Sequence, residues 1–109
     1  HQQQQICTQL SVLLKGVICL RLIPVKEGVG RIPACEIMLL TPTISRLIRE
    51  NKVWEITKYI EEGKIFGLQT FEQALIKFCK SGKITEEEAL SFCDNKDEFV
   101  LALKGIKKR

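Results

Sequence analysis

One carboxylate and two arginines are the charged side chains in this sequence whose positions suggest chemistry. Glu36 lies between Cys35 and Ile37 in a strand-like segment that is otherwise apolar. Burying an unpaired carboxylate is costly, so we expect Glu36 to have a partner. The candidates are Arg21, in the preceding apolar segment, and Arg49, in the following one. The group could sense a nucleotide or a neighbouring subunit, but the simpler explanation, a purely structural ion pair, is favoured.

A second candidate site is an eight-residue run that follows the same segment. Its residues are Thr43, Ile44, Ser45, Arg46, Leu47, Ile48, Arg49 and Glu50. At helical spacing the three aliphatic residues share one face and the charged residues lie elsewhere, as in an ordinary amphipathic helix. The planar guanidinium groups could also hold a carboxylate or a phosphate.

Catalytic and metal-binding patterns are otherwise missing from the sequence. There is no G-x-x-x-x-G-K-[ST] loop to cradle phosphates. The single histidine is His1, so no Ser-His or Cys-His pair can activate a nucleophile. The five cysteines stand at positions 7, 19, 35, 79 and 93 without a C-x-x-C pair, which argues against zinc and fits a reducing cytoplasm. We therefore expect no catalytic, cofactor-binding or metal-ligating residue in this chain.

The charge is uneven along the 109 residues. Residues 1–54 hold seven Lys and Arg against three Asp and Glu, whereas residues 55–109 hold ten of each, so the first half carries the net charge of +4. A basic surface can face solvent or another subunit, or it can bind nucleic acid or an acidic protein. No apolar stretch is long enough for membrane insertion.

The hydrophobic periodicity predicts an α+β, mostly α fold, with one β-hairpin attached to a helical bundle in a single domain over 1–109. Thr41-Pro42 is a strong helix start, and Asp97 is expected to cap the last helix. The second strand, apolar on both sides, should be largely buried. The predicted elements are a helix over 5–20, the hairpin over 20–40, and helices over 42–51, 53–62, 70–81, 86–94 and 98–104.

The run from Thr43 to Glu50 resembles the Ala-Ile-Arg-Asn-Leu-Ile-Arg-Glu signature of PilT-like retraction ATPases, the type II/IV secretion ATPases that retract type IV pili. Thr43, Ser45 and Arg46 replace Ala, Arg and Asn of that signature. Further blocks are similar to the family over nearly the whole chain: Gln9-Leu10-Ser11, Leu22-Ile23-Pro24, Gly30–Ile37, Gly67–Leu75 and Gly82–Leu90. The four-cysteine insert of the extension ATPases is not present near the hairpin, which favours the retraction branch.

The resemblance implies the C-terminal part of a RecA-like motor, normally a hexamer, that powers pilus retraction and twitching motility. It implies ATP and Mg as cofactors of the parent protein, with the ATP-binding core upstream of His1, so that this part couples hydrolysis to retraction without being an ATPase itself. The expected place is the bacterial cytoplasm, peripheral to the inner membrane, beside the inner-membrane pilus machinery. Nucleic acid is not an expected partner.

Two further expectations concern the isolated chain. Its apolar stripe at residues 6–18 is an association hazard, so we expect a dimer or a swapped oligomer. The alternative to a motor fragment is a free-standing basic helical module that binds an acidic partner or nucleic acid.

Overall fold

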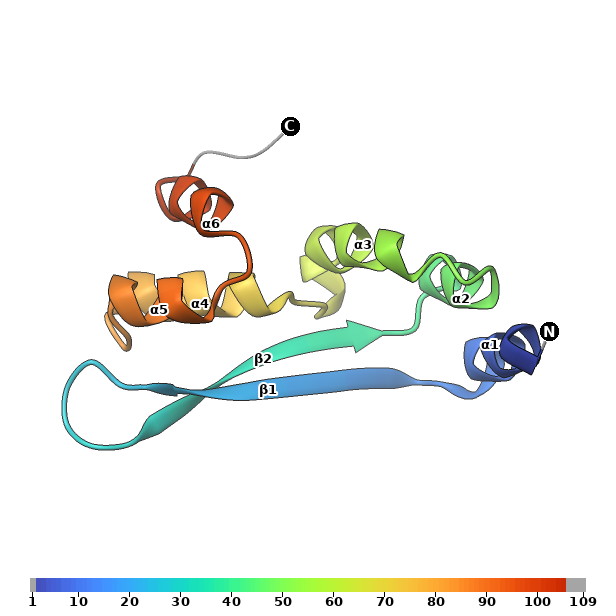
Figure 1. Cartoon of the computed structure of the whole chain (residues 1–109), viewed down its shortest axis with the longest axis horizontal. Helices are drawn as coiled ribbons and strands as arrows, with labels where there is room; N and C mark the ends of the chain where they lie inside the picture. The colour runs from blue at the N-terminus through green and yellow to red at the C-terminus, as the bar shows by residue number, and fades with distance from the viewer. Residues whose placement is uncertain (1, 106–109) are drawn as a thin grey trace. The chain divides into compact units, whose positions relative to one another are not determined.

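The computed structural model describes residues 2–105. The fold is mostly helical with one two-stranded hairpin, which confirms the predicted α+β class (Figure 1). In chain order the elements are α1 (Gln2–Leu13), β1 (Gly16–Pro24), β2 (Arg31–Leu39), α2 (Pro42–Arg49), the 3-10 turn η1 (Val53–Glu55), α3 (Ile56–Glu62), the 3-10 turn η2 (Lys64–Phe66), α4 (Phe71–Lys80), α5 (Glu86–Phe92) and α6 (Lys96–Leu103).

The contacts within the chain cluster in two compact units, where the sequence predicts one domain. The first unit contains the residues up to Ile18 together with Ile37–Thr70. The second contains Cys19–Glu36 together with the residues from Phe71 onward.

The hairpin has a regular register. Leu40 N–H donates to Lys15 O over 3.1 Å, and Val25 N–H donates to Gly30 O over 3.2 Å. The residue numbers of both pairs sum to 55, so no bulge interrupts the ladder between them. Arg21 therefore stands opposite Ala34, and the N–H and C=O groups of the even-numbered residues of β1 point away from β2.

In the first unit, α2 supplies most of the buried apolar surface. Thr41 caps the helix as predicted, because its Oγ1 accepts a hydrogen bond from Ile44 N–H over 3.1 Å. Ile44 and Ile48 pack with Ile60 of α3 and with Leu68. The apolar face expected from the sequence is thus the buried face of α2.

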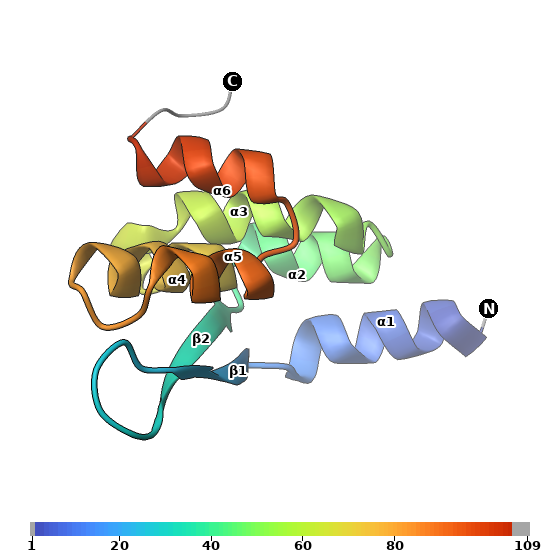
Figure 2. The same cartoon turned by 60° about the vertical axis from the view of Figure 1, so that its left-hand side comes forward.

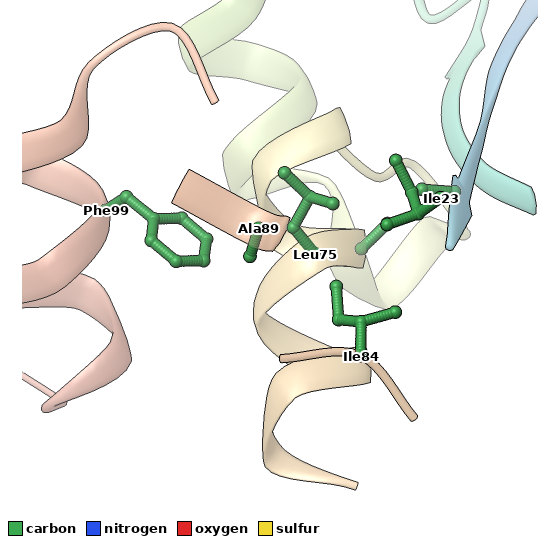
Figure 3. Packing of buried hydrophobic residues seen from close by; sticks show 7 residues of the cluster. Ile23, Leu75, Ile84, Ala89 and Phe99 are labelled. Atoms are coloured by element: carbon green, nitrogen blue, oxygen red, sulfur yellow. The ribbon is translucent and has the colours of Figure 1, made fainter. Parts of the chain in front are cut away.

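The second unit has the larger core. Leu75 and Ala74 of α4 are packed with side chains from five other segments: Ile23 of β1, Ala34 of β2, Ile84 between α4 and α5, Ala89 of α5 and Phe99 of α6. Figure 3 shows Ile23 and Phe99 approaching the α4–α5 pair from opposite sides. The helices α4 and α5 lie against one another in both views (Figure 2). Thr85 Oγ1 caps α5 by accepting from Glu88 N–H over 3.1 Å.

The predicted helix over 5–20 is wrong at its C-terminal end. Helix α1 stops at Leu13, and the residues from Gly16 belong to β1. Position 16 is close to the facing strand, where a Cβ atom would lie 3.0 Å from Met38 O. The β-branched residues Val17 and Ile18 suit a strand, so pairing with β2 prevails over the helical spacing of the aliphatic residues.

Three smaller expectations also need correction. Strand β2 is not largely buried, since only Ala34 among its residues is fully covered. The predicted helix over 53–62 begins as the 3-10 turn η1, in which Val53 has 55% of its surface exposed, and becomes α-helical only at Ile56. The cap of α6 is Asn95 and not Asp97, because Asn95 Oδ1 accepts from Glu98 N–H over 3.0 Å. His1 and residues 106–109 lie outside the described part of the chain.

Candidate functional site

Glu36 lies on β2 in the second unit and is half-buried. Its Oε1 accepts a hydrogen bond from Phe71 N–H over 3.1 Å. Phe71 is the first residue of α4, whose first-turn N–H groups have no partner within the helix. A carboxylate at this end is also favoured by the helix dipole. Glu36 thus anchors the start of α4 to the hairpin.

Arg21 approaches the same residue from the other strand. Its guanidinium carbon lies 4.7 Å from the centroid of the Phe71 ring, in a cation–π contact. Its Nη1 also donates to Phe92 O over 3.3 Å. Both predicted residues therefore meet at Phe71, but through its backbone and its ring and not through an ion pair with each other. Sequence reasoning missed this because Phe71 is 35 positions beyond Glu36.

Helix α2, with the family-like run, is fixed to α1 through polar contacts in the first unit. Ser45 Oγ donates to Ser11 O over 2.5 Å. Gln4 Nε2 donates to Arg49 O over 2.8 Å, which satisfies a carbonyl at the C-terminal end of α2. Ser45, one of the three departures from the family signature, is thus directed to α1.

The remaining face of α2 is charged and exposed. Glu50 Oε1 lies 3.2 Å from Arg46 Nη1 and 3.3 Å from Lys52 Nζ. The hydrogen bond from Lys52, helped by the positive charges of Arg46 and Arg49, lowers the pKa of Glu50. The side chain of Arg49 is exposed on the same helix. Arg49 belongs to the first unit and Glu36 to the second, and the structure gives Glu36 the backbone partner described above.

A shallow pocket of about 360 Å³ opens in the second unit beside Lys26, Cys79, Lys80 and Glu86. Burial, and then the charge of Glu86, raises the pKa of Cys79, so its thiol stays protonated near neutral pH. Within residues 2–105, no three His, Cys, Asp or Glu side chains gather as a metal site would need. None of the helices in that range could cross a membrane. The Cys79 thiol is therefore not an activated nucleophile.

Comparison with known proteins identifies relatives along most of the chain. The chain is 35% identical over 100 residues to the type IV pilus ATPase PilU of Pseudomonas aeruginosa, a match that covers 92% of this chain and 26% of PilU. It is 39% identical over 89 residues to the retraction ATPase PilT of the same organism, covering 82% of this chain and 26% of PilT. A twitching motility protein of Neisseria gonorrhoeae is 31% identical over 98 residues, covering 90% of this chain and 26% of that protein.

A solved structure agrees with these matches. The crystal structure of the pilus retraction motor PilT with bound ADP superposes with a TM-score of 0.76 at 36% identity, covering 90% of this chain and 26% of that one. No family model matches the chain. The chain thus spans about a quarter of the length of the relatives that it matches.

Proposed function

Because the chain belongs to the family of PilT-like type IV pilus retraction ATPases, we propose that it forms the C-terminal part of such a motor. The observation that carries the proposal is the extent of the likeness, with 35% identity to PilU over 92% of the chain. The similarity of fold to the PilT motor, at a TM-score of 0.76, supports it independently. A partial match to an unrelated helical module would not extend through a helix, a hairpin and the closing helices together.

In this proposal the chemistry of ATP belongs to the parent protein. A phosphate-binding loop, ATP and Mg would be supplied by the part of the motor that this chain does not match. The parent would work as a hexamer in the bacterial cytoplasm, next to the inner-membrane pilus machinery. The chain by itself would neither bind ATP tightly nor hydrolyse it, because its sequence has no loop to cradle phosphates.

The residues we assign to coupling are the exposed charges of α2. Three interactions hold this helix in place: the side-chain cap from Thr41, the packing of the buried aliphatic face, and the hydrogen bond from Ser45 to α1. Arg46, Arg49 and Glu50 are then presented to another part of the motor on a rigid element. Changing them should alter retraction without unfolding the chain, since exposed side chains contribute little to stability.

A chimera tests the proposal. The segment of P. aeruginosa PilT that matches this chain is replaced by the 109 residues, and twitching and Mg-ATP turnover are measured in a strain without its own PilT. We expect turnover and at least partial twitching. Arg49→Ala in the chimera should reduce twitching more than Lys77→Ala, an exposed lysine on α4 that serves as the matched control.

The chimera has clear contradicting results. A chimera that folds and hydrolyses ATP but supports no twitching would refute the coupling role of this segment. Equal effects of Arg49→Ala and Lys77→Ala would refute the assignment of coupling to α2.

A further inference from the structure

The C-terminal end of α2 is closed by a left-handed turn. Asn51 has a φ of 57°, and among residues 2–105 it is the one residue other than glycine with a positive φ. Its N–H donates to Ile48 O over 3.0 Å. The next N–H, of Lys52, donates to Leu47 O over 2.8 Å. This is the Schellman arrangement, in which one left-handed residue lets the following N–H groups reach back to the last helical turn. Asparagine tolerates that conformation better than most residues with a side chain.

The same turn brings two charged side chains together. Glu50 and Lys52 are two residues apart, and residues at that spacing face different sides of a helix. Lys52 Nζ nevertheless lies 3.3 Å from Glu50 Oε1. The pair can form because the left-handed residue between them, Asn51, changes the direction of the chain. Arg46, four residues before Glu50, reaches the same oxygen in the ordinary helical way, over 3.2 Å.

One carbonyl at this end of the helix is bound from α1. The last four carbonyls of an α-helix have no partner within the helix unless the residues that follow it supply one. In α2 the first three of them accept from the backbone N–H groups of Glu50, Lys52 and Asn51. The fourth, Arg49 O, accepts from Gln4 Nε2 over 2.8 Å. This bond fixes the backbone from which the guanidinium of Arg49 projects.

We propose that Asn51 and Gln4 are positioning residues, which give the charged end of α2 a single arrangement. Asn51 holds Lys52 beside Glu50. Gln4 holds the backbone of Arg49. Ion pairs between exposed side chains contribute little unless their geometry is already supplied, because ordering two long side chains costs entropy. Here the backbone supplies the geometry, so less order has to be gained when α2 meets its partner in the motor. The arrangement belongs to the 109-residue chain, and its use in coupling rests on the proposed function.

The first test is the pKa of Glu50 in the whole chain, followed by carboxyl-carbon NMR during an acid titration. The hydrogen bond from Lys52, helped by the charges of Arg46 and Arg49, lowers this pKa. Asn51→Val should raise it towards its ordinary value, because a β-branched residue disfavours the left-handed turn and Lys52 then leaves the carboxylate. Asn51→Gly should keep the lowered pKa, because glycine adopts the turn freely.

Reference variants make this first test decisive. Lys52→Ala removes the donor itself and sets the rise expected for complete loss of the pair with Glu50. Asn51→Ala, which strains the turn less than valine, replaces Asn51→Val if that chain unfolds. An unchanged Glu50 pKa in the valine or alanine variant would overturn the role of Asn51, and so would an equal rise in the glycine variant.

The second test uses the chimera with PilT. Gln4→Leu removes the donor to Arg49 O, so we expect a loss of twitching while Mg-ATP turnover is retained. Gln5→Leu is the matched control and should leave twitching unchanged, because Gln5 is the next residue of α1 and is exposed. Asn51→Val should also lower twitching, and Asn51→Gly should restore it. Equal twitching in the two glutamine variants would overturn the role of Gln4.

The two tests fail separately. If the unmodified chimera hydrolyses ATP but does not twitch, the proposed function is refuted, and the pKa of Glu50 still decides whether Asn51 positions Lys52. If the chimera twitches but the pKa of Glu50 does not respond to Asn51→Val, the positioning by Asn51 is refuted and the proposed function stands.

Discussion

Helices α1 and α4 have similar lengths but opposite relations to the units in which they lie. In the second unit, α4 buries Ala74 and Leu75 in a core that draws on five other segments. In the first unit, the one buried residue of α1 is Ser11, while its apolar side chains Val12 and Leu13 are 71% and 72% exposed. Helix α4 is held by apolar packing, and α1 is attached to α2 chiefly through hydrogen bonds such as Ser45 Oγ to Ser11 O.

This difference between α1 and α4 shows that an apolar stripe found in a sequence does not identify the surface that covers it. The stripe of α4 meets other parts of its own unit. The side chains that form the stripe of α1 remain exposed in this chain, at 55% for Ile6 and 45% for Leu10. Exposed apolar surface of this kind marks interaction sites, as the sequence led us to expect for residues 6–18.

The largest expected effect is on the core of the second unit. Phe99→Ala should lower the free energy of unfolding by about 3–5 kcal/mol, because the ring is fully buried and its removal leaves a cavity. Leu101→Ala on the same helix is the control and should cost under about 1 kcal/mol, because Leu101 is 43% exposed. Urea denaturation followed by circular dichroism measures both. Equal losses would mean that α6 does not seal this core.

A smaller effect is expected at the hydrogen bond that attaches α4 to the hairpin. Glu36→Leu should cost about 1–2 kcal/mol, because Phe71 N–H loses its acceptor. Glu36→Gln should cost roughly half as much, since the amide oxygen can still accept. The losses in stability of the two variants are compared through their urea denaturation midpoints. A glutamine variant as unstable as the leucine variant would show that the charge of Glu36, and not the hydrogen bond alone, carries the effect.

Acidification should change the contributions of Glu72 and Glu50 to the free energy of unfolding in opposite directions. Glu72 lies in the second unit and Glu50 in the first, and their pKa values are shifted in opposite senses. Burial raises the pKa of Glu72 in the second unit, with the nearby charges of Asp94 and Glu98 adding to it. The hydrogen bond from Lys52 lowers the pKa of Glu50 in the first unit. A raised pKa stabilises the fold below the unfolded value of about 4.3, and this stability is lost as the pH rises through the folded pKa. A lowered pKa stabilises above that value, and this stability is lost as the pH falls.

The measurement is the free energy of unfolding between acidic and neutral pH for three chains. Wild type minus Glu72→Gln should decrease as the pH rises through the acidic range, and wild type minus Glu50→Gln should increase. The Glu50 effect should be the weaker, because its ion pairs with Arg46 and Lys52 are exposed and salt screens them. If both differences in the free energy of unfolding changed with pH in the same direction, the opposite pKa shifts of Glu72 and Glu50 would be contradicted.

The smallest effect is expected on α1. Leu13→Ser should change the stability of the first unit by less than about 0.5 kcal/mol, because the side chain is exposed. A loss comparable to that of Phe99→Ala would show that the stripe of α1 is buried in solution, by another copy or by another surface. Repeating the measurement at several protein concentrations distinguishes the two, since burial by another copy depends on concentration.

The sequence predicted local interactions such as helix caps, but it did not predict pairing between residues that are distant in the chain. Thr41-Pro42 predicted the cap of α2 because the donor and acceptor lie three residues apart. The strand at Gly16–Leu20 was missed because its helical spacing is overridden by pairing with β2, which no local pattern reveals.

The same limit applies to the candidate site. The need of Glu36 for a partner followed from its apolar surroundings, but its partner, Phe71, lies in another element. The convergence of Arg21 on that ring became evident only with the register of the hairpin. The blocks of similarity to a family predicted more about this chain than its composition did.

The most direct test of the motor assignment is mass spectrometry with peptide mapping of the native gene product in its source cell. We predict a product much larger than 12.4 kDa, with upstream peptides that include a G-x-x-x-x-G-K-[ST] loop. A native product that begins near His1, with no such peptides in the same polypeptide, would contradict the assignment and favour a free-standing interaction module.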